Sequence, residues 1–141
     1  MLADRMRIAS SGGAADTNGI GGLYDLIAGD RKAGFFGEIA NEDFITQTDL
    51  RVMVGLSRGG MSASSWLKFM LDGNILITSR HPISRDVSWN ALESLDIIYG
   101  DRIVEILGHS YKVRLFKGAK NDPSIGGEAI GSEWNRLMLP I

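Results

Sequence analysis

The dipeptide Asp72-Gly73 constrains the fold of this chain more than any other local feature. It separates two apolar runs, residues 66–71 and 75–78. A two-residue Asp-Gly connection between apolar runs is among the strongest short signals for a β-hairpin. The chain also has 18 glycines against 3 prolines, which implies many turns at positive φ and favours a turn-rich β domain over a helix bundle.

A second hairpin is predicted at residues 103–107 and 111–117, joined around Gly108-His109. Glycine at the first turn position is typical of a type II′ turn. In the second strand, apolar side chains alternate with basic ones, so one face is expected to be buried and the other wet. The alternating residues are Tyr111, Lys112, Val113, Arg114 and Leu115.

Short helices are predicted where a serine or threonine precedes an apolar periodic segment, because its side-chain oxygen can accept from a free N–H of the first turn. Thr48 is the expected N-cap of the first helix, which Gly55 would end. Ser88 is the expected cap of the second helix, and Ser132 opens a last one that runs to Met138. The sequence thus predicts a small α+β domain, β-rich and built of antiparallel hairpins, with two or three short helices.

The first 34 residues are expected to form an extended, Gly-rich N-terminal arm, ahead of a β-rich module at residues 35–141. Glycine-rich chain is flexible, so the arm is either a disordered tail or a segment that becomes ordered only against a neighbouring subunit. Four clustered apolar residues favour the second interpretation, because a solvated tail has little use for them: Leu23, Tyr24, Leu26 and Ile27.

Composition excludes several classes of protein. With 141 residues the chain is expected to form one domain, and its net charge of −2 lacks the basic surplus typical of nucleic-acid binders. There is no cysteine, and no run of 18 apolar residues that would predict a membrane span. The basic cluster of Arg80, His81 and Arg85 lacks interleaved aromatics, so the rim of an interface is the better interpretation.

Candidate chemistry is sparse. Residues 55–59 match the Gly-x-Ser-x-Gly nucleophile elbow at Ser57, and an aspartate before His109 would complete a Ser-Asp-His order. The elbow needs a strand before it and a long helix after it, whereas a short helix and a Gly/Ser loop are predicted here. An enzyme is therefore the weakest hypothesis, and no catalytic residue is assigned.

No cofactor or metal is expected either. The two histidines, His81 and His109, lack partners at metal-ligand spacing. Asp122, Glu128 and Glu133 lie in or just after the glycine-rich loop at 118–131. The segment lacks the alternating ligands of a calcium loop, so solvated acids are the better interpretation.

Tryptophan marks three element starts. Trp66, Trp89 and Trp134 are expected to lie mainly in the core, because each buries a large apolar area. An exposed tryptophan, together with the basic face of residues 112–117, would instead favour a carbohydrate- or receptor-binding module.

Seven short motifs follow one another along the second half of the chain. They are Trp66-Leu67-Lys68-Phe69, Asp72-Gly73-Asn74, Pro82-Ile83-Ser84, Val87-Ser88-Trp89, Tyr99-Gly100-Asp101, Tyr111-Lys112-Val113-Arg114-Leu115 and Gly131-Ser132-Glu133-Trp134-Asn135-Arg136-Leu137-Met138. In this order, and with the upstream segments Ala33–Glu38 and Phe44–Thr46, they resemble a family of virion structural proteins of tailed bacteriophages, which form tails, baseplates or fibre attachments. The resemblance covers residues 33–139.

The resemblance implies a non-enzymatic virion protein, made in the host cytoplasm, whose partners are other virion proteins and further copies of itself in a symmetric assembly. Larger relatives continue past the last motif into a further domain, so the resemblance implies a connector or fibre-attachment role for this chain, with a head decoration or collar protein as the alternative. It implies no cofactor, nucleic acid or membrane span. The residues expected at its interfaces are Tyr24, Phe35, Phe36, Trp134, Arg136 and Leu139.

Overall fold

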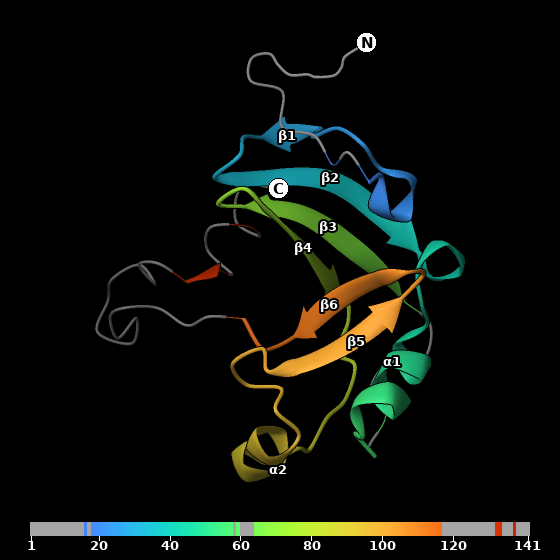
Figure 1. Ribbon diagram of the computed structural model, residues 1–141, viewed down its shortest axis with the longest axis vertical. Helices are drawn as coiled ribbons and strands as arrows, with labels where there is room; N and C mark the ends of the chain where they lie inside the picture. The colour runs from blue at the N-terminus through green and yellow to red at the C-terminus, as the bar shows by residue number, and fades with distance from the viewer. Residues whose placement is uncertain are drawn as a thin grey trace. The chain divides into compact units, whose positions relative to one another are not determined.

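Two antiparallel sheets form the skeleton of the fold in the computed structural model (Figure 1). The structure describes residues 16, 18–57, 59, 64–116, 132, 133 and 137. A four-stranded sheet has the order β1-β2-β3-β4, and a separate hairpin consists of β5 and β6. With two short α-helices, this confirms the predicted α+β class. The strands are β1 (Ala28–Gly29), β2 (Ala33–Ala40), β3 (Ser65–Leu71), β4 (Asn74–Ser79), β5 (Arg102–Ile106) and β6 (His109–Val113).

The chain divides into two compact units. Unit 1 contains the described residues up to Glu38, then Leu67–Ile77 and the described residues from Phe116 onward. Unit 2 contains Ile39–Trp66 and Thr78–Leu115, as far as they are described. Strands β2, β3 and β4 each contribute residues to both units.

The predicted Asp-Gly hairpin is confirmed between β3 and β4. Its central residues Asp72 and Gly73 both have positive φ, 49° and 82°, as a type I′ turn requires. This turn matches the right-handed twist of the strands it connects, and it lies against a neighbouring turn. The N–H groups of Asp72 and Gly73 donate to the carbonyls of Lys32 and Arg31.

The second hairpin is also present, but its predicted turn was wrong. The turn residues are Leu107 and Gly108, with φ of 52° and 84°, so glycine occupies the second position of a type I′ turn and not the first of a type II′ turn. His109 is the first residue of β6 and pairs with Ile106. A glycine in an apolar context fixes the place of a turn only to within one residue, because the neighbouring leucine also adopts positive φ here.

Two α-helices lie in unit 2, α1 (Gln47–Val54) and α2 (Trp89–Ser94). The predicted N-cap Thr48 was wrong by two residues, because the Thr46 side chain accepts from the Asp49 N–H at 3.0 Å. Gly55 ends α1 at φ 87° as predicted. The predicted cap Ser88 is confirmed, since its hydroxyl accepts from the Ala91 N–H at 3.1 Å.

The described chain also contains shorter helical segments. Two are 3-10 turns, η2 (Ile20–Gly22) and η3 (Asn41–Asp43). Of the predicted helix that Ser132 opens, Glu133 and Leu137 are helical, and the remaining positions lie outside the described residues. In the described part of the chain, no helix has both the length and the apolar character needed to cross a membrane.

Each unit has its own buried apolar residues. In unit 1, Phe36 and Met70 form one cluster, and Phe69, Leu71 and Leu137 form another. In unit 2, the Phe44 ring stands edge-on to the rings of Trp66 and Tyr111, at centroid distances of 5.2 and 5.5 Å.

The tryptophans have different environments. Trp66 is buried as expected, with 2% of its surface exposed, and its indole N–H donates to the Ile45 carbonyl at 2.7 Å. Trp89, at the start of α2, is 55% exposed. Trp134 lies outside the described residues.

Candidate functional site

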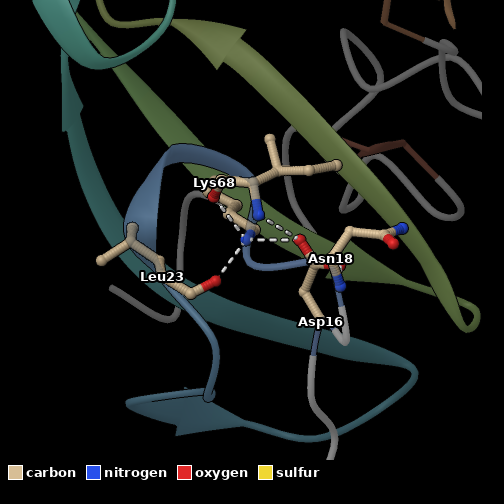
Figure 2. Close-up of polar contacts among 5 residues, drawn as sticks. Asp16, Asn18, Leu23 and Lys68 are labelled. Carbon is tan, nitrogen blue, oxygen red and sulfur yellow. Dashed lines mark hydrogen bonds and ion pairs between the residues drawn. The ribbon is translucent and has the colours of Figure 1, made fainter. Parts of the chain in front are cut away.

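A fully buried lysine lies in the middle of β3. Lys68 has no exposed surface, although a lysine is almost never buried unless it is paired. Its ammonium donates to three oxygens, which are Asp16 Oδ2 at 2.7 Å, the Ile20 carbonyl at 2.7 Å and the Leu23 carbonyl at 2.5 Å (Figure 2). An ammonium has three N–H donors, so every donor of Lys68 has an acceptor.

The acceptors all belong to one N-terminal segment, Asp16 and residues 18–27, which we call the strap. Asp16 organises it, because its carboxylate also accepts from the N–H groups of Asn18 and Ile20 at 3.0 and 2.8 Å. The Asp16 N–H donates to the Tyr24 carbonyl at 2.8 Å and closes the segment into a loop. The loop therefore presents one carboxylate and two carbonyls to a single cation.

Glycine is required where the strap turns. Gly19 has φ 61° and Gly21 has φ 70°, both in the left-handed region. A Cβ added to Gly19 would lie 2.3 Å from Cζ of the Tyr24 ring. The glycine-rich composition that predicted flexibility instead allows this backbone to approach an aromatic ring closely.

Apolar contacts hold the strap on unit 1 as well. Leu23 and Leu26 pack against the cluster of Phe36 and Met70. The Lys68 ammonium lies 4.5 Å from the centroid of the Phe36 ring, within range of a cation–π interaction. We call Lys68, Phe36 and Met70 the strap site. It combines one buried positive charge with an apolar surface.

Burial changes the pKa values of both Lys68 and Asp16. Burial lowers the pKa of Lys68 below 10.5, and the hydrogen bond and the charge of Asp16 offset only part of that effect. For Asp16, burial alone would raise the pKa, but hydrogen bonds from Lys68 and the Ile20 N–H outweigh it and bring the pKa below 3.8. At neutral pH the strap is thus held by an ionised carboxylate.

The expected arm is ordered where it is described. Residues 18–34 include η2, β1 and the start of β2, and the strap packs on the chain's own sheet. The expected boundary between residues 34 and 35 falls inside β2. Within one chain, Lys68 supplies the anchor for these residues.

The predicted interface residues differ in how much of their surface is exposed. Tyr24 is 58% exposed, whereas Phe36 is 1% exposed and lies in the core of unit 1. Phe35 is half-buried and its ring packs on Phe69, with centroids 5.2 Å apart. Phe36 therefore offers no free surface to a partner, because alternation along β2 turns it toward Met70. The other three predicted residues lie outside the described part of the chain: Trp134, Arg136 and Leu139.

Ile27 was missed as an outward-facing residue. It is 70% exposed, while its N–H donates to the Phe35 carbonyl at 2.8 Å and fixes its backbone against β2. Tyr24 and Ile27 therefore form an exposed apolar pair on an anchored backbone. Four apolar residues in the sequence indicated that the segment was not a plain tail, but two of them face inward and two face outward.

The hydrolase pattern lacks its structural context. Ser57 is exposed and follows the end of α1, where an elbow would need a strand. A different serine, Ser64, lies 2.9 Å from His81 Nδ1 in an exposed hydrogen bond. Two of the three acids considered for calcium, Asp122 and Glu128, lie outside the described residues. Within the described ranges, no three His, Cys, Asp or Glu side chains are grouped in a way that would hold a metal ion.

Comparison with known proteins adds no relative: no family model matches this chain, and neither a curated protein nor a solved structure matches it.

Proposed function

We propose that this chain is a non-enzymatic structural component of a tailed-phage virion, a tail or baseplate connector or fibre-attachment protein. It assembles with other virion proteins and with further copies of itself, and it needs no cofactor. The motif resemblance suggests the class of protein. The observation that carries the proposal is the exposed pair Tyr24 and Ile27, 58% and 70% exposed on the anchored strap.

An anchored apolar pair suits a docking role. Tyr24 and Ile27 lie three residues apart on one anchored segment, and exposed apolar side chains that are grouped together are typical of surfaces that another protein covers. Tyrosine is also enriched among the residues that dominate binding energy at interfaces. The Lys68 anchor reduces the entropy lost when a partner binds, because the backbone of the strap is already ordered.

The proposal is tested in a phage that encodes this chain, by replacing Tyr24 and Ile27 together with serine. The variant is expected to stay folded and soluble, because both side chains are exposed, and to be strongly depleted from purified particles. Quantitative mass spectrometry of the particles gives the readout. Ile103→Ser is the matched control, since Ile103 is also an exposed apolar residue, 61% exposed, but it lies on β5. Absence of the unmodified chain from particles would refute the proposal.

The same experiment locates the chain. A head decoration or collar protein would also be lost from particles, so labelled unmodified chain is viewed on intact particles by electron microscopy. Label at the tail or baseplate is the expected result, and label on the head or collar would favour the alternative.

A carbohydrate- or receptor-binding module is the second candidate, and one observation favours it. Trp89 is 55% exposed at the start of α2, and an exposed indole can stack on a sugar ring. Binding to a glycan array that is lost in Trp89→Ala and kept in Ile103→Ser would support this candidate. A lack of binding by the unmodified chain would dismiss it.

A further inference from the structure

We infer that the strap site accepts the strap of a second copy of this chain, so that neighbouring copies exchange straps when they assemble. The inference deepens the proposed function by naming a partner for the strap and its site.

An empty strap site would be strongly destabilising. Without the strap, the Lys68 ammonium would lose the carboxylate of Asp16, 2.7 Å away, and Phe36 and Met70 would lose the cover of Leu23 and Leu26. A buried charge without its partner is strongly destabilising. Any occupant must therefore bring a carboxylate, two suitably placed carbonyls and two apolar side chains.

A second copy supplies this chemistry by construction. Its Asp16, Ile20 and Leu23 would present the same three oxygens to Lys68, because the loop that arranges them is closed within the strap by the Asp16 N–H and the Tyr24 carbonyl. Exchange of an identical element between protomers is a low-cost route to association, since every contact broken within one copy is made again in the next.

The exposed pair provides a reason for exchange to be favourable. Within one copy, Tyr24 and Ile27 stay in water although they flank the residues that reach the strap site. A strap that crosses to a neighbour pivots near Ile27, whose N–H is bonded to the Phe35 carbonyl of its own chain. Tyr24 and Ile27 then lie at the boundary between the two copies, where they become buried. Neighbouring copies in a regular assembly also present the site at high effective concentration, which favours the crossing.

Engineered disulfides test the exchange directly, because the chain has no cysteine of its own. Leu23 packs against the cluster that contains Met70, so one full-length chain carries Leu23→Cys and another carries Met70→Cys. The two variants are unfolded in urea, mixed in equal amounts, refolded together over a concentration series and oxidised. Non-reducing gels and peptide mass spectrometry then measure the bridge between residues 23 and 70 of different chains.

Exchange predicts that the yield of this bridge is about tenfold or more higher than the yield of bridged product in a control mixture of Leu23→Cys with Ile103→Cys. It also predicts that the yield rises with protein concentration. The double variant Leu23→Cys/Met70→Cys in one chain verifies that the two positions can form a bridge at all. If it forms its internal bridge while the mixture gives only the control level of product, the inference is overturned.

Light scattering on unmodified chain gives a second test that needs no cysteine. After refolding at high concentration, exchange predicts a dimer, and replacing Tyr24 and Ile27 together with serine should reduce its share, because these two side chains gain cover only in the exchanged form. A monomer at every concentration would overturn the inference. The two ideas fail separately, because a chain found in particles without bridged copies contradicts only the exchange, whereas exchange by a chain absent from particles contradicts only the proposed function.

Discussion

Lys68 and Asp16 show how one buried ion pair determines the path of a whole segment. Each charge is 4% exposed or less, so neither can exchange its partner for water. A buried pair contributes little net stability compared with apolar residues of the same size, but loss of one member is costly. The pair fixes where the strap lies on β3, because Lys68 donates to Asp16, Ile20 and Leu23.

Removing one charge should destabilise the protein more than removing both. Asp16→Asn is expected to lower the free energy of unfolding by about 3 kcal/mol, since it leaves a buried ammonium without its anion. The double variant Asp16→Asn/Lys68→Met should recover much of that loss. Urea denaturation measures all three proteins. Asp30→Asn is the control, because Asp30 also accepts two backbone N–H bonds but is exposed; an equal loss there would contradict the role of burial.

Acid should weaken the strap through Asp16. Because the pKa of Asp16 is lowered below 3.8 in the folded chain, the unfolded chain takes up this proton at higher pH than the folded chain does. The stabilisation is therefore complete above 3.8 and is lost as the pH falls through the folded-state pKa. Lys68, the charged group that faces Asp16, stays protonated over this range.

Urea midpoints of the unmodified chain and Asp16→Asn, measured from neutral pH down to strong acid, check the acid prediction. The difference between the two proteins should be constant near neutrality and shrink below 3.8. A difference that does not change with pH would mean that Asp16 does not hold the strap through its charge.

The residue-scale features were the hardest to predict from sequence. A lysine inside the run Trp66–Leu71 was a visible signal, because a charge in an apolar strand needs a partner. Its partner lies 52 positions away, and no local pattern indicates a contact over that distance. The burial of Phe36 was not predicted either, since a short apolar run between glycines does not reveal which of its faces the sheet covers.

Local elements were predicted best where one side chain determines the backbone. Asp72-Gly73 and Ser88 act within three residues, and both predictions are confirmed. The first helix was displaced by two residues, because Thr46 and Thr48 are both acceptable caps and only the packing of α1 distinguishes between them. The predicted turn between β5 and β6 was displaced by one residue, because Leu107 and not His109 accompanies Gly108 in the turn.

The turn between β5 and β6 contains a leucine, which is poorly suited to positive φ. Leu107 has φ 52° and is 70% exposed, although a non-glycine residue in the left-handed region costs about 1 kcal/mol or more. Leu107→Asn should therefore raise the free energy of unfolding by about 1 kcal/mol, because Asn-Gly is a preferred type I′ pair.

Thermal or urea denaturation measures that gain. Leu107→Ala is the matched variant, since it removes the exposed leucine side chain but keeps an unfavourable Cβ at the same φ. If alanine stabilises the protein as much as asparagine does, then relief of the exposed apolar surface, and not the turn, explains the effect.

At the scale of the whole molecule, the described chain consists of two units with different surfaces. Unit 1 buries an ion pair and carries the exposed pair Tyr24 and Ile27. Unit 2 exposes Trp89 while it buries Trp66 against Phe44. The α+β class followed from the sequence because hairpin signals are local, whereas the division into units depends on long-range contacts that no motif encodes.

Fluorescence quenching checks the two environments of tryptophan. Trp89→Phe should remove a large part of the fluorescence that iodide quenches, because Trp89 is 55% exposed, whereas Trp66→Phe should leave that part nearly unchanged, because Trp66 is 2% exposed. Trp134 is present in both variants and contributes equally to both. Equal losses of quenchable signal in the two variants would contradict the exposed position of Trp89.

The separation of Asp16 and Lys68 along the chain has a consequence for protein synthesis. Asp16 leaves the ribosome 52 residues before Lys68, and at about 5–20 residues per second it waits about 3–10 s for its counter-charge to appear. Throughout that interval Asp16 lacks the ammonium of Lys68 on its own chain. On a polysome, the first completed β3 that it meets can belong to the chain ahead.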